Sequence, residues 1–396
     1  MKNKPSDYAK NEPSFAAVLL AAGYASRFGR CKAAATIEGL SILTRCVEAF
    51  RRGGVQDVVV VTGAWEDEVR SAAPRGSCRF VRNPRFDSGM FSSVRAGLDA
   101  AGHGCDGVFI HPVDVPLILP STVRKLTRAF TGEKAEKWFV PTLENAHENM
   151  EGRRAEGYMT DGHVMGGHPI LIPRSWKKSI KNWTGEGGLR NFLALHEKER
   201  VRVPVFDEGV LLDVDTPEDL DRLIRWSRRR HVPRRSTIES LLELAKTPQR
   251  VVSHQRRVAE VASRVGQLCG RASVDLDLLN AAAELHDILK TESAHAKKGA
   301  DFLEENGFPE VAELVRVHTD LSPKATIEAE ILYLADKYVN GTEVHSLRER
   351  EQRVRQRFAD NREALETALY RMKVAIDIEK HLEKLTGVHP LLQYVT

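Results

Sequence analysis

Short apolar runs alternate with segments of helical spacing through the first half of the chain. The apolar and β-branched runs, which predict strands, cover 15–22, 57–61, 79–81 and 107–110. Between them, apolar residues recur every three or four positions over 40–52 and 88–101, and Gly53 and Gly54 can end the first of these helices. Strands separated by helices imply right-handed crossovers. We therefore predict an α/β domain with a mostly parallel sheet and helices on both faces.

The pattern changes near Thr237. From there on strand signals end, aromatic residues become few, and Ala, Leu, Glu and Arg recur with helical periods. This half is predicted to be all-α. The basic cluster at 225–235 lies at the change and is interpreted as a solvated linker between domains. The predicted organisation is a flexible tail over 1–14, the α/β domain over 15–230 and the all-α domain over 231–396.

Length, charge and cysteine content narrow the class of protein. The chain of 396 residues is long enough for two domains, and 59 basic against 55 acidic side chains leave a net charge of +4. This balance does not favour nucleic acid as a partner. The longest apolar runs, about eight residues, are far below the roughly 20 that span a bilayer. Five cysteines without any Cys-x-x-Cys spacing argue against a disulfide framework and a thiolate zinc site, so we expect a cytoplasmic protein.

The turn after the first strand has the composition of a phosphate-binding loop. The segment 23–32 contains two glycines, a serine, two arginines and a lysine. Glycine allows the backbone to approach a phosphate chain, while Arg27 and Lys32 supply positive charge. The alternative is a solvated basic turn. Since ligands of parallel sheets bind beyond the carboxyl ends of the strands, we expect this loop at the binding site.

Three further stretches should meet at the same edge of the sheet. A Pro/Gly turn over 83–92 leads into a helix, Asp114 follows a strand directly, and Asp213 and Asp215 lie on one face of an extended segment. Mg²⁺ on a triphosphate takes one or two carboxylates together with phosphate oxygens. Asp114 with Asp213 or Asp215 is therefore the predicted Mg²⁺ site. The sequence leaves open which of the last two binds, and capping of the next helix is the alternative role for Asp215.

These motifs together resemble the molybdenum cofactor cytidylyltransferases of the molybdopterin nucleotidyltransferase family. The matching stretches are Leu20-Ala21-Ala22-Gly23, Ser26-Arg27-Phe28-Gly29, Lys32, Asn83-Pro84, Ser92-Ser93-Val94, His111-Pro112-Val113-Asp114, Gly167-His168-Pro169 and Asp213-Val214-Asp215-Thr216-Pro217. The resemblance covers about residues 15–228 and implies a Rossmann-like nucleotidyltransferase domain. Two features depart from the family pattern: Ala33-Ala34-Ala35 replaces a bulkier continuation, and 134–166 is a long polar insertion. The insertion leaves the acceptor's identity open.

The resemblance also implies roles for individual residues. Arg27 and Lys32 would bind phosphates, and Asp114 would bind the metal. The nucleotide would be held by Ala21, Ala22, Gly23, Ser26, Gly29, Asn83 and Ser92. The implied reaction transfers CMP from CTP, or another NTP, to molybdopterin or a related phosphorylated acceptor and releases diphosphate. Positioning and electrostatics suffice for such a transfer. A molybdoenzyme or its maturation factor would be the protein partner.

Polar residues interrupt the apolar stripes of the helical half at a few positions. His254 precedes Val258 and Val261 at helical spacing, so it lies on a buried face. His286 ends a similar stripe, with Asp287 beside it on the same predicted helix, and Asp336 ends another. A single inward histidine is usually a hydrogen-bonded core residue, but an inward carboxylate is costly unless a cation such as a metal ion compensates it. Their combination predicts a metal site.

His254, His286-Asp287 and Asp336 resemble the defining pattern of the HD phosphohydrolase superfamily. His295 and His318 resemble the further histidines of HD proteins that carry two metals and hydrolyse dinucleoside polyphosphates. The resemblance implies one or two divalent ions such as Fe or Mn, held by His254, His286, Asp287, His295, His318 and Asp336. Asp287 and Lys290 would act in catalysis, Lys290 by contacting a substrate phosphate. We predict a bifunctional enzyme; the alternative is a nucleotidyltransferase regulated by a nucleotide-binding, non-catalytic HD domain.

Overall fold

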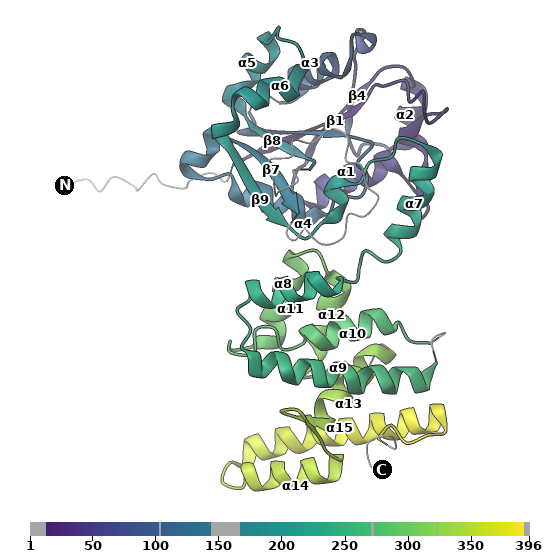
Figure 1. Cartoon of the computed structure of the whole chain (residues 1–396), viewed down its shortest axis with the longest axis vertical. Helices are drawn as coiled ribbons and strands as arrows, with labels where there is room; N and C mark the ends of the chain where they lie inside the picture. The colour runs from purple at the N-terminus through teal and green to yellow at the C-terminus, as the bar shows by residue number, and fades with distance from the viewer. Residues whose placement is uncertain (1–12, 103, 144–166, 271–272, 323, 392–396) are drawn as a thin grey trace, which may run out of the picture. The chain divides into compact units, whose positions relative to one another are not determined.

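The computed structural model of the chain divides into two compact units, 1–228 and 229–396 (Figure 1). It describes residues 13–102, 104–143, 167–270, 273–322 and 324–391. Residues 1–12 of the predicted tail and 144–166 of the predicted insertion therefore lie outside the described residues.

A seven-stranded sheet forms the centre of the first unit (Figure 1). In spatial order its strands are β5 (Arg79–Arg82), β4 (Asp57–Thr62), β1 (Phe15–Ala21), β6 (Gly107–Pro112), β8 (Ile170–Pro173), β7 (Trp138–Leu143) and β9 (Arg200–Val205). β8 runs antiparallel to both neighbours, and the other neighbouring pairs are parallel. The mostly parallel sheet is thus confirmed, and β1 lies between β4 and β6, which brings the end of β1 beside the end of β6.

Alternation along β1 explains why both faces of this sheet are covered. Ala17, Leu19 and Ala21 belong to one apolar core, whereas Ala16 and Val18 belong to another. Successive side chains of a strand point to opposite faces, so a continuous apolar run needs packing partners on both. The helices that supply them are α1 (Ile42–Arg52), α2 (Glu66–Ala72), α3 (Met90–Ala100), α4 (Pro120–Ala129), α5 (Lys177–Asn182), α6 (Gly188–Leu195) and α7 (Pro217–Ser227).

Helix α1 begins two residues later than its periodicity predicts. Leu40 and Ser41 form β3, which pairs with β2 (Thr36–Ile37) in a short hairpin. The Ser41 hydroxyl accepts a hydrogen bond from the Thr44 amide at 2.9 Å and so caps the helix. The predicted end is confirmed, because Gly53 follows the last helical residue.

The second unit is helical, as predicted. Its helices are α8 (Arg235–Leu244), α9 (Gln249–Cys269), α10 (Leu276–Leu285), α11 (His295–Glu305), α12 (Pro309–Val317), α13 (Ile327–Tyr338), α14 (Leu347–Arg357) and α15 (Arg362–Thr386). A two-residue ladder between β10 (Val339–Asn340) and β11 (Glu343–Val344) follows α13, which the sequence did not predict. No helix in the described part of the chain has the length and apolarity needed to cross a bilayer.

Candidate active sites

The glycine-containing loop after β1 is a folded turn that returns the chain to the strand end. Phe28 is buried and anchors the loop to the core. The amides of Phe28 and Gly29 both donate to the carbonyl of Ala25, at 2.9 and 3.0 Å. Gly29 has φ +76°, which a side chain would disfavour. This compact turn places Lys32, the first residue of the short 3-10 helix Lys32–Ala34, beside the carboxyl end of the sheet.

Lys32 is surrounded by carboxylates from distant segments. Its Nζ lies 3.0 Å from Oδ1 of Asp215 and 3.8 Å from Oδ2 of Asp114. The Arg27 guanidinium lies 2.8 Å from the other oxygen of Asp215. Asp114 follows β6, and the Val214 amide donates to the Asp114 carbonyl at 2.8 Å, which ties the two acidic segments together. The predicted phosphate-binding cations and magnesium ligands therefore meet at one place.

Asp215 does not cap the next helix. The N-cap of α7 is Thr216, whose hydroxyl accepts from the Asp219 amide at 3.2 Å. Asp219 in turn accepts from the amides of Thr216 and Asp215, which completes a capping box. The capping alternative is thereby removed, and the Asp215 carboxylate is left to pair with the cations of the loop.

The acidic cluster has unusual electrostatics. Burial, opposed by Lys32 but reinforced by the negative charges of Asp213 and Asp215, raises the pKa of Asp114 to about 6. Burial and then Asp215 also raise the pKa of Asp213. Such shifts mark carboxylates that gain from an added cation. Mg²⁺ needs only one or two of them, because phosphates and water supply the remaining oxygens. The residues present thus fit a magnesium ion carried in with a triphosphate.

Two pockets adjoin at Asp114. A smaller pocket, of about 320 Å³, is lined by Ala21, Ala22, Gly23 and Lys32. A larger one, of about 580 Å³, is lined by Trp138, His168, Arg190 and Asp213 among others. Residues common to both are Leu20, Gly89, Met90, Pro112 and Asp114. Two molecules bound in these pockets would therefore meet at the Asp114 carboxylate.

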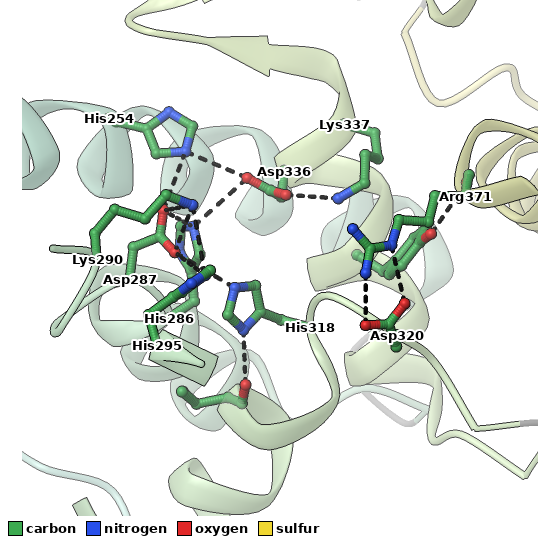
Figure 2. Close-up of polar contacts among 12 residues, drawn as sticks. His254, His286, Asp287, Lys290, His295, His318, Asp320, Asp336, Lys337 and Arg371 are labelled. Carbon is green, nitrogen blue, oxygen red and sulfur yellow. Dashed lines mark hydrogen bonds and ion pairs between the residues drawn. The ribbon is translucent and has the colours of Figure 1, made fainter. Parts of the chain in front are cut away.

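The second unit contains two groups of metal-ligand atoms that share Asp287 (Figure 2). In each group, three ligand atoms lie within 4.8 Å of one another. Oδ2 of Asp287 lies 3.4 Å from Nε2 of His286 and 4.0 Å from Nε2 of His254. Oδ1 lies 3.2 and 3.4 Å from Nε2 of His295 and His318. One carboxylate thus faces a histidine pair with each of its oxygens, as a bridging ligand of two ions would.

Asp336 completes the first group. Its Oδ1 lies 3.3 Å from Nε2 of His254 and 3.6 Å from Nε2 of His286 (Figure 2). Asp336 comes from α13, His254 from α9, and His286 and Asp287 from the turn that follows α10. The four predicted ligands of the HD pattern therefore converge from two helices and one turn.

Backbone carbonyls fix which ring nitrogen of each histidine carries the proton. Nδ1 of His254, His286 and His318 lies 3.0, 2.8 and 2.7 Å from the carbonyl oxygens of Gly341, Ala283 and Val315. Because a carbonyl only accepts, Nδ1 must donate, and a neutral ring then directs the Nε2 lone pair at a carboxylate. Nε2 of His286 is a buried atom without a hydrogen-bond partner among the described residues. The Nε2 lone pair and the carboxylate oxygen that faces it are both acceptors, so a cation must lie between them. The ligand atoms of this cluster therefore fit metal ions.

The charge of the cluster leads to the same conclusion. Burial alone would lower the pKa of His286, but Asp287 and Asp336 raise it to about 10. Burial would raise the pKa of Asp287, yet the surrounding histidines, His286 foremost, hold it well below its usual range. The buried carboxylates thus require positive charge beside them, which protons or metal ions can provide.

Each of the two units matches the profile of a known family. Residues 17–201 match the family profile of the MobA-like NTP transferase domain, and residues 251–341 match that of the HD domain. The chain joins a MobA-like NTP transferase domain to an HD domain.

Individual relatives resemble the transferase domain. A nicotine blue oxidoreductase of Paenarthrobacter nicotinovorans is 29% identical over 214 residues, which cover 54% of this chain and 97% of that protein. A probable molybdenum cofactor guanylyltransferase of Opitutus terrae is 26% identical over 229 residues, covering 56% and 98%. A solved nucleotidyl transferase of Methanothermobacter thermautotroptrophicus has 23% identity and a TM-score of 0.44, covering 55% and 98%.

The predicted nucleotide ligands of the MobA-like domain fall into three sets. Ala21, Ala22 and Gly23 line the smaller pocket, and no atom lies within 4 Å of where a Gly23 side chain would begin. Ser26 and Gly29 lie farther along the loop and are exposed. The buried Asn83 donates to the hydroxyls of Ser92 and Ser93 at 2.8 and 2.9 Å. In this arrangement Asn83 and Ser92 hold the turn before α3, and direct binding by them stays a prediction.

The HD residues differ from the prediction in one respect. We expected His286 and Asp287 to project from one helix, but α10 ends at Leu285 and His286 is its C-cap. The turn that follows brings Lys290 to the site, where its Nζ lies 3.0 Å from Oδ2 of Asp287. Lys290 is half exposed, with 46% of its side chain accessible, so it can reach a bound phosphate. The expectation of a shared helix was therefore wrong, although the structure does bring the predicted residues together.

Sequence reasoning did not single out two residues of the larger pocket. Arg190 lies in the first turn of α6, after Gly187 and Gly188, both of which have positive φ. Trp138 begins β7 and lines the same pocket. The glycine-rich stretch before α6 was the available signal for Arg190, since such turns precede phosphate-binding helices. Trp138 had no signal of its own, because an apolar residue at a strand start is ordinarily a core residue.

Proposed function

We propose that this protein is a bifunctional enzyme. Its first unit transfers a nucleotide from an NTP to molybdopterin or a related phosphorylated acceptor and releases diphosphate. Its second unit is a metal-dependent phosphohydrolase of a nucleotide or another phosphoanhydride. The main support for the transferase activity is that Asp114 lines both of two adjoining pockets. The main support for the hydrolase activity is that two groups of ligand atoms share Asp287.

In the transfer reaction, the residues of the protein bind the two substrates and orient them. The NTP would occupy the smaller pocket, with its phosphates beside Arg27 and Lys32, and the acceptor would occupy the larger one. The acceptor phosphate would then attack the α-phosphorus in line, while Lys32 stabilises charge on the leaving diphosphate. Mg²⁺ held by Asp114, with Asp213 or Asp215, would neutralise charge on the phosphates. No covalent nucleophile of the protein is needed.

The nucleotide and the acceptor are proposals that rest on resemblance. The motif pattern favours CTP, whereas two relatives are named molybdenum cofactor guanylyltransferases. The experiment is a screen of CTP, GTP and ATP with molybdopterin and Mg²⁺, read as diphosphate release. Acceptor-dependent release with one nucleotide supports the proposal. No release with any of them, from folded protein, contradicts it.

A redox reaction is the competing function for the first unit, because one relative is named nicotine blue oxidoreductase. The carboxylates of Asp114 and Asp215 beside Lys32 favour metal-assisted phosphate chemistry, since hydride transfer needs no such acidic cluster. Incubation with NADH or NADPH and quinone-like or pterin acceptors, followed by absorbance of the reduced nicotinamide, separates the two. Oxidation that survives Asp114→Asn would favour the redox function.

In the HD domain, the ions held by the histidines and carboxylates would polarise a phosphate oxygen. The protein's own contribution is to hold Asp287 between the two histidine pairs and to place Lys290 beside the reacting phosphate. The alternative is a sensor that binds a nucleotide without hydrolysis and regulates the transferase. Protein loaded with Mn²⁺ or Fe²⁺ should hydrolyse nucleoside polyphosphates. Binding without hydrolysis, coupled to a changed transferase rate, would favour the sensor.

A further inference from the structure

One cavity of the C-terminal unit is lined by cations. It has a volume of about 770 Å³ and lies among α13, α14 and α15. The basic residues that line it are Lys337, Arg350, Arg353, Arg357 and Arg371. Among the described lining residues, Glu363 is the one acid. Pockets of about 300–1,000 Å³ are typical of small-ligand sites, so this cavity has the size of a binding site.

Three of these arginines form a stripe on one face of α14. Arg350, Arg353 and Arg357 are spaced by three and four residues, so they stack on the same side of the helix. None of the three forms an ion pair with a carboxylate in the described part of the chain; Arg353 contacts the ring of His345 and Arg357 lies over Phe358. The other two arginines of α14, Arg348 and Arg355, do not line the cavity. Arg355 pairs instead with Glu351.

Like charges this close are unfavourable without an anion. Burial, and then the neighbouring charges of Arg353 and Arg357, lower the pKa of the Arg350 guanidinium against the opposing effect of Asp336. Lys337 and Arg371, at the other walls, are already paired with Asp336 and Asp320, at 2.7 and 2.8 Å (Figure 2). The uncompensated charge of the cavity is therefore that of the α14 stripe, offset only by Glu363 among the described lining residues.

The cavity adjoins the metal-ligand cluster. Lys337 lines the cavity, and its Nζ contacts Oδ2 of Asp336, whose Oδ1 faces His254 and His286 (Figure 2). The side chain of Asp336 therefore lies between the cationic cavity and the metal-ligand cluster. Of the lining residues, all but Lys337 and Asn340 follow position 341, where the match to the HD domain ends. The helices added after that domain thus supply the cationic wall.

We propose that this cavity binds the phosphate chain of a nucleoside polyphosphate whose reacting phosphate lies at the Asp287 and Asp336 cluster. Guanidinium groups form paired hydrogen bonds with phosphate oxygens, and three in a row match a ligand with several phosphates better than one with a single carboxylate. The inference rests on the proposed phosphohydrolase and specifies its substrate class: phosphoanhydrides with a chain that extends beyond the reacting phosphate.

Binding of inorganic tripolyphosphate, measured by calorimetry, tests the proposal without turnover. The protein is the full chain with Arg27→Ala and Lys32→Ala, which remove the phosphate-binding cations of the other unit, and it is treated with EDTA. In this background, Arg353→Gln/Arg357→Gln should weaken binding on the order of tenfold for each cation lost. The control, Arg348→Gln/Arg355→Gln, loses the same charge from the same helix outside the cavity and should bind as the parent does.

The remaining variants keep the test decisive. Arg353 and Arg357 are exposed, so their replacement should not unfold the domain, which circular dichroism verifies. Arg353→Lys/Arg357→Lys should restore part of the affinity. Equal weakening by the control pair, or none by the cavity pair, overturns the inference.

Kinetics then separate this inference from the hydrolase itself. Loss of the cavity arginines should raise KM for a nucleoside triphosphate and leave hydrolysis of p-nitrophenyl phosphate unchanged. If the parent hydrolyses neither compound but the binding difference persists, the phosphohydrolase proposal fails and the anion site stands. If both substrates are affected equally, the cavity is not a subsite for the chain.

Discussion

The Nζ atom of Lys32 lies 3.0 Å from Oδ1 of Asp215, although 183 positions separate the two residues along the chain. Arg27 reaches the other oxygen of the same carboxylate at 2.8 Å. Arg27 and Lys32 are therefore both paired with Asp215 before any nucleotide binds. The phosphates of an incoming NTP must compete with Asp215 for them, and a divalent cation brought in with the phosphates would compensate the carboxylate that they leave.

Lys32→Ala should lower the turnover of the transferase on the order of 10² or more, because it removes a cation that acts on the leaving diphosphate. The measurement is diphosphate release at saturating NTP and acceptor. Arg30→Ala is the matched control, since Arg30 is an exposed cation of the same loop that lines neither pocket. Near-normal turnover of the Lys32→Ala variant would show that the loop has only a structural role.

Asp114→Asn should abolish Mg²⁺-dependent transfer and leave phosphohydrolysis intact. Asp114 lies between the two pockets of the first unit, whereas the HD ligands belong to the second. Both activities are assayed on one preparation, with Asp221→Asn, an exposed carboxylate of α7, as the control. A parallel loss of both activities in folded protein would contradict the assignment of two independent sites.

Asp287→Ala and His318→Ala should differ in metal content. Asp287 faces both histidine pairs, so its loss should remove all bound metal together with hydrolysis. His318 belongs to one group only, so its loss should release the ion of that group and keep the other. Elemental analysis of purified protein gives the stoichiometry, and His381→Ala, an exposed histidine outside the site, is the control. Full metal content in Asp287→Ala would rule out a bridging role, and the transferase should be unaffected throughout.

Chelation should destabilise the second unit but not the first. Metal bound only to the native state stabilises it by about 2.7 kcal/mol when the free metal is 100 times the dissociation constant. All five tryptophans lie between Trp65 and Trp226, so their fluorescence reports the first unit alone. EDTA should leave the tryptophan transition in place and shift the helical circular dichroism transition of the second unit to lower denaturant. Equal shifts of both transitions would indicate that the metal is not confined to the HD domain.

Acid should destabilise the first unit through its buried histidines. Burial, with the charge of His168, lowers the pKa of His111 to about 3, and burial lowers that of His168 to about 4. The unfolded value is about 6.5, so this stability is complete above pH 6.5 and is lost as the pH falls toward the folded values. For His111 alone the loss between pH 7 and pH 5 is about 2 kcal/mol.

The pH effect is read from urea transitions of tryptophan fluorescence. His111→Gln should show a shallower loss of unfolding free energy over this range, since the amide can still donate to the Val115 carbonyl that Nε2 of His111 contacts at 2.9 Å. His196→Gln, a histidine packed against Trp176 and Phe192, serves as the control. An unchanged pH slope in His111→Gln would show that His111 does not titrate in the folded protein as described.

Much of the local structure followed from the sequence, because periodicity and residue chemistry act over short distances. The apolar run at 15–22 needed packing partners on both faces, and Gly53 could end the helix predicted before it. The same local reasoning identified Arg27, Lys32 and Asp114, and the histidines and carboxylates of the HD pattern. It failed at His286, where the apolar stripe continued but the helix had already ended at Leu285.

The tertiary structure decided which of these groups face one another. Spacing along the chain could not separate capping from cation pairing at Asp215, because both roles suit a carboxylate before a helix, and only the fold brings Lys32 within reach. In the same way, the sequence named Asp287 as a ligand, but its two oxygens face different histidine pairs only because α9, α10, α11 and α12 pack around it. The sequence analysis did not single out the arginines of α14, which form a cavity wall only because α13 and α15 pack beside them. Distances between segments far apart in sequence are set by tertiary packing, which cannot be deduced from local sequence patterns.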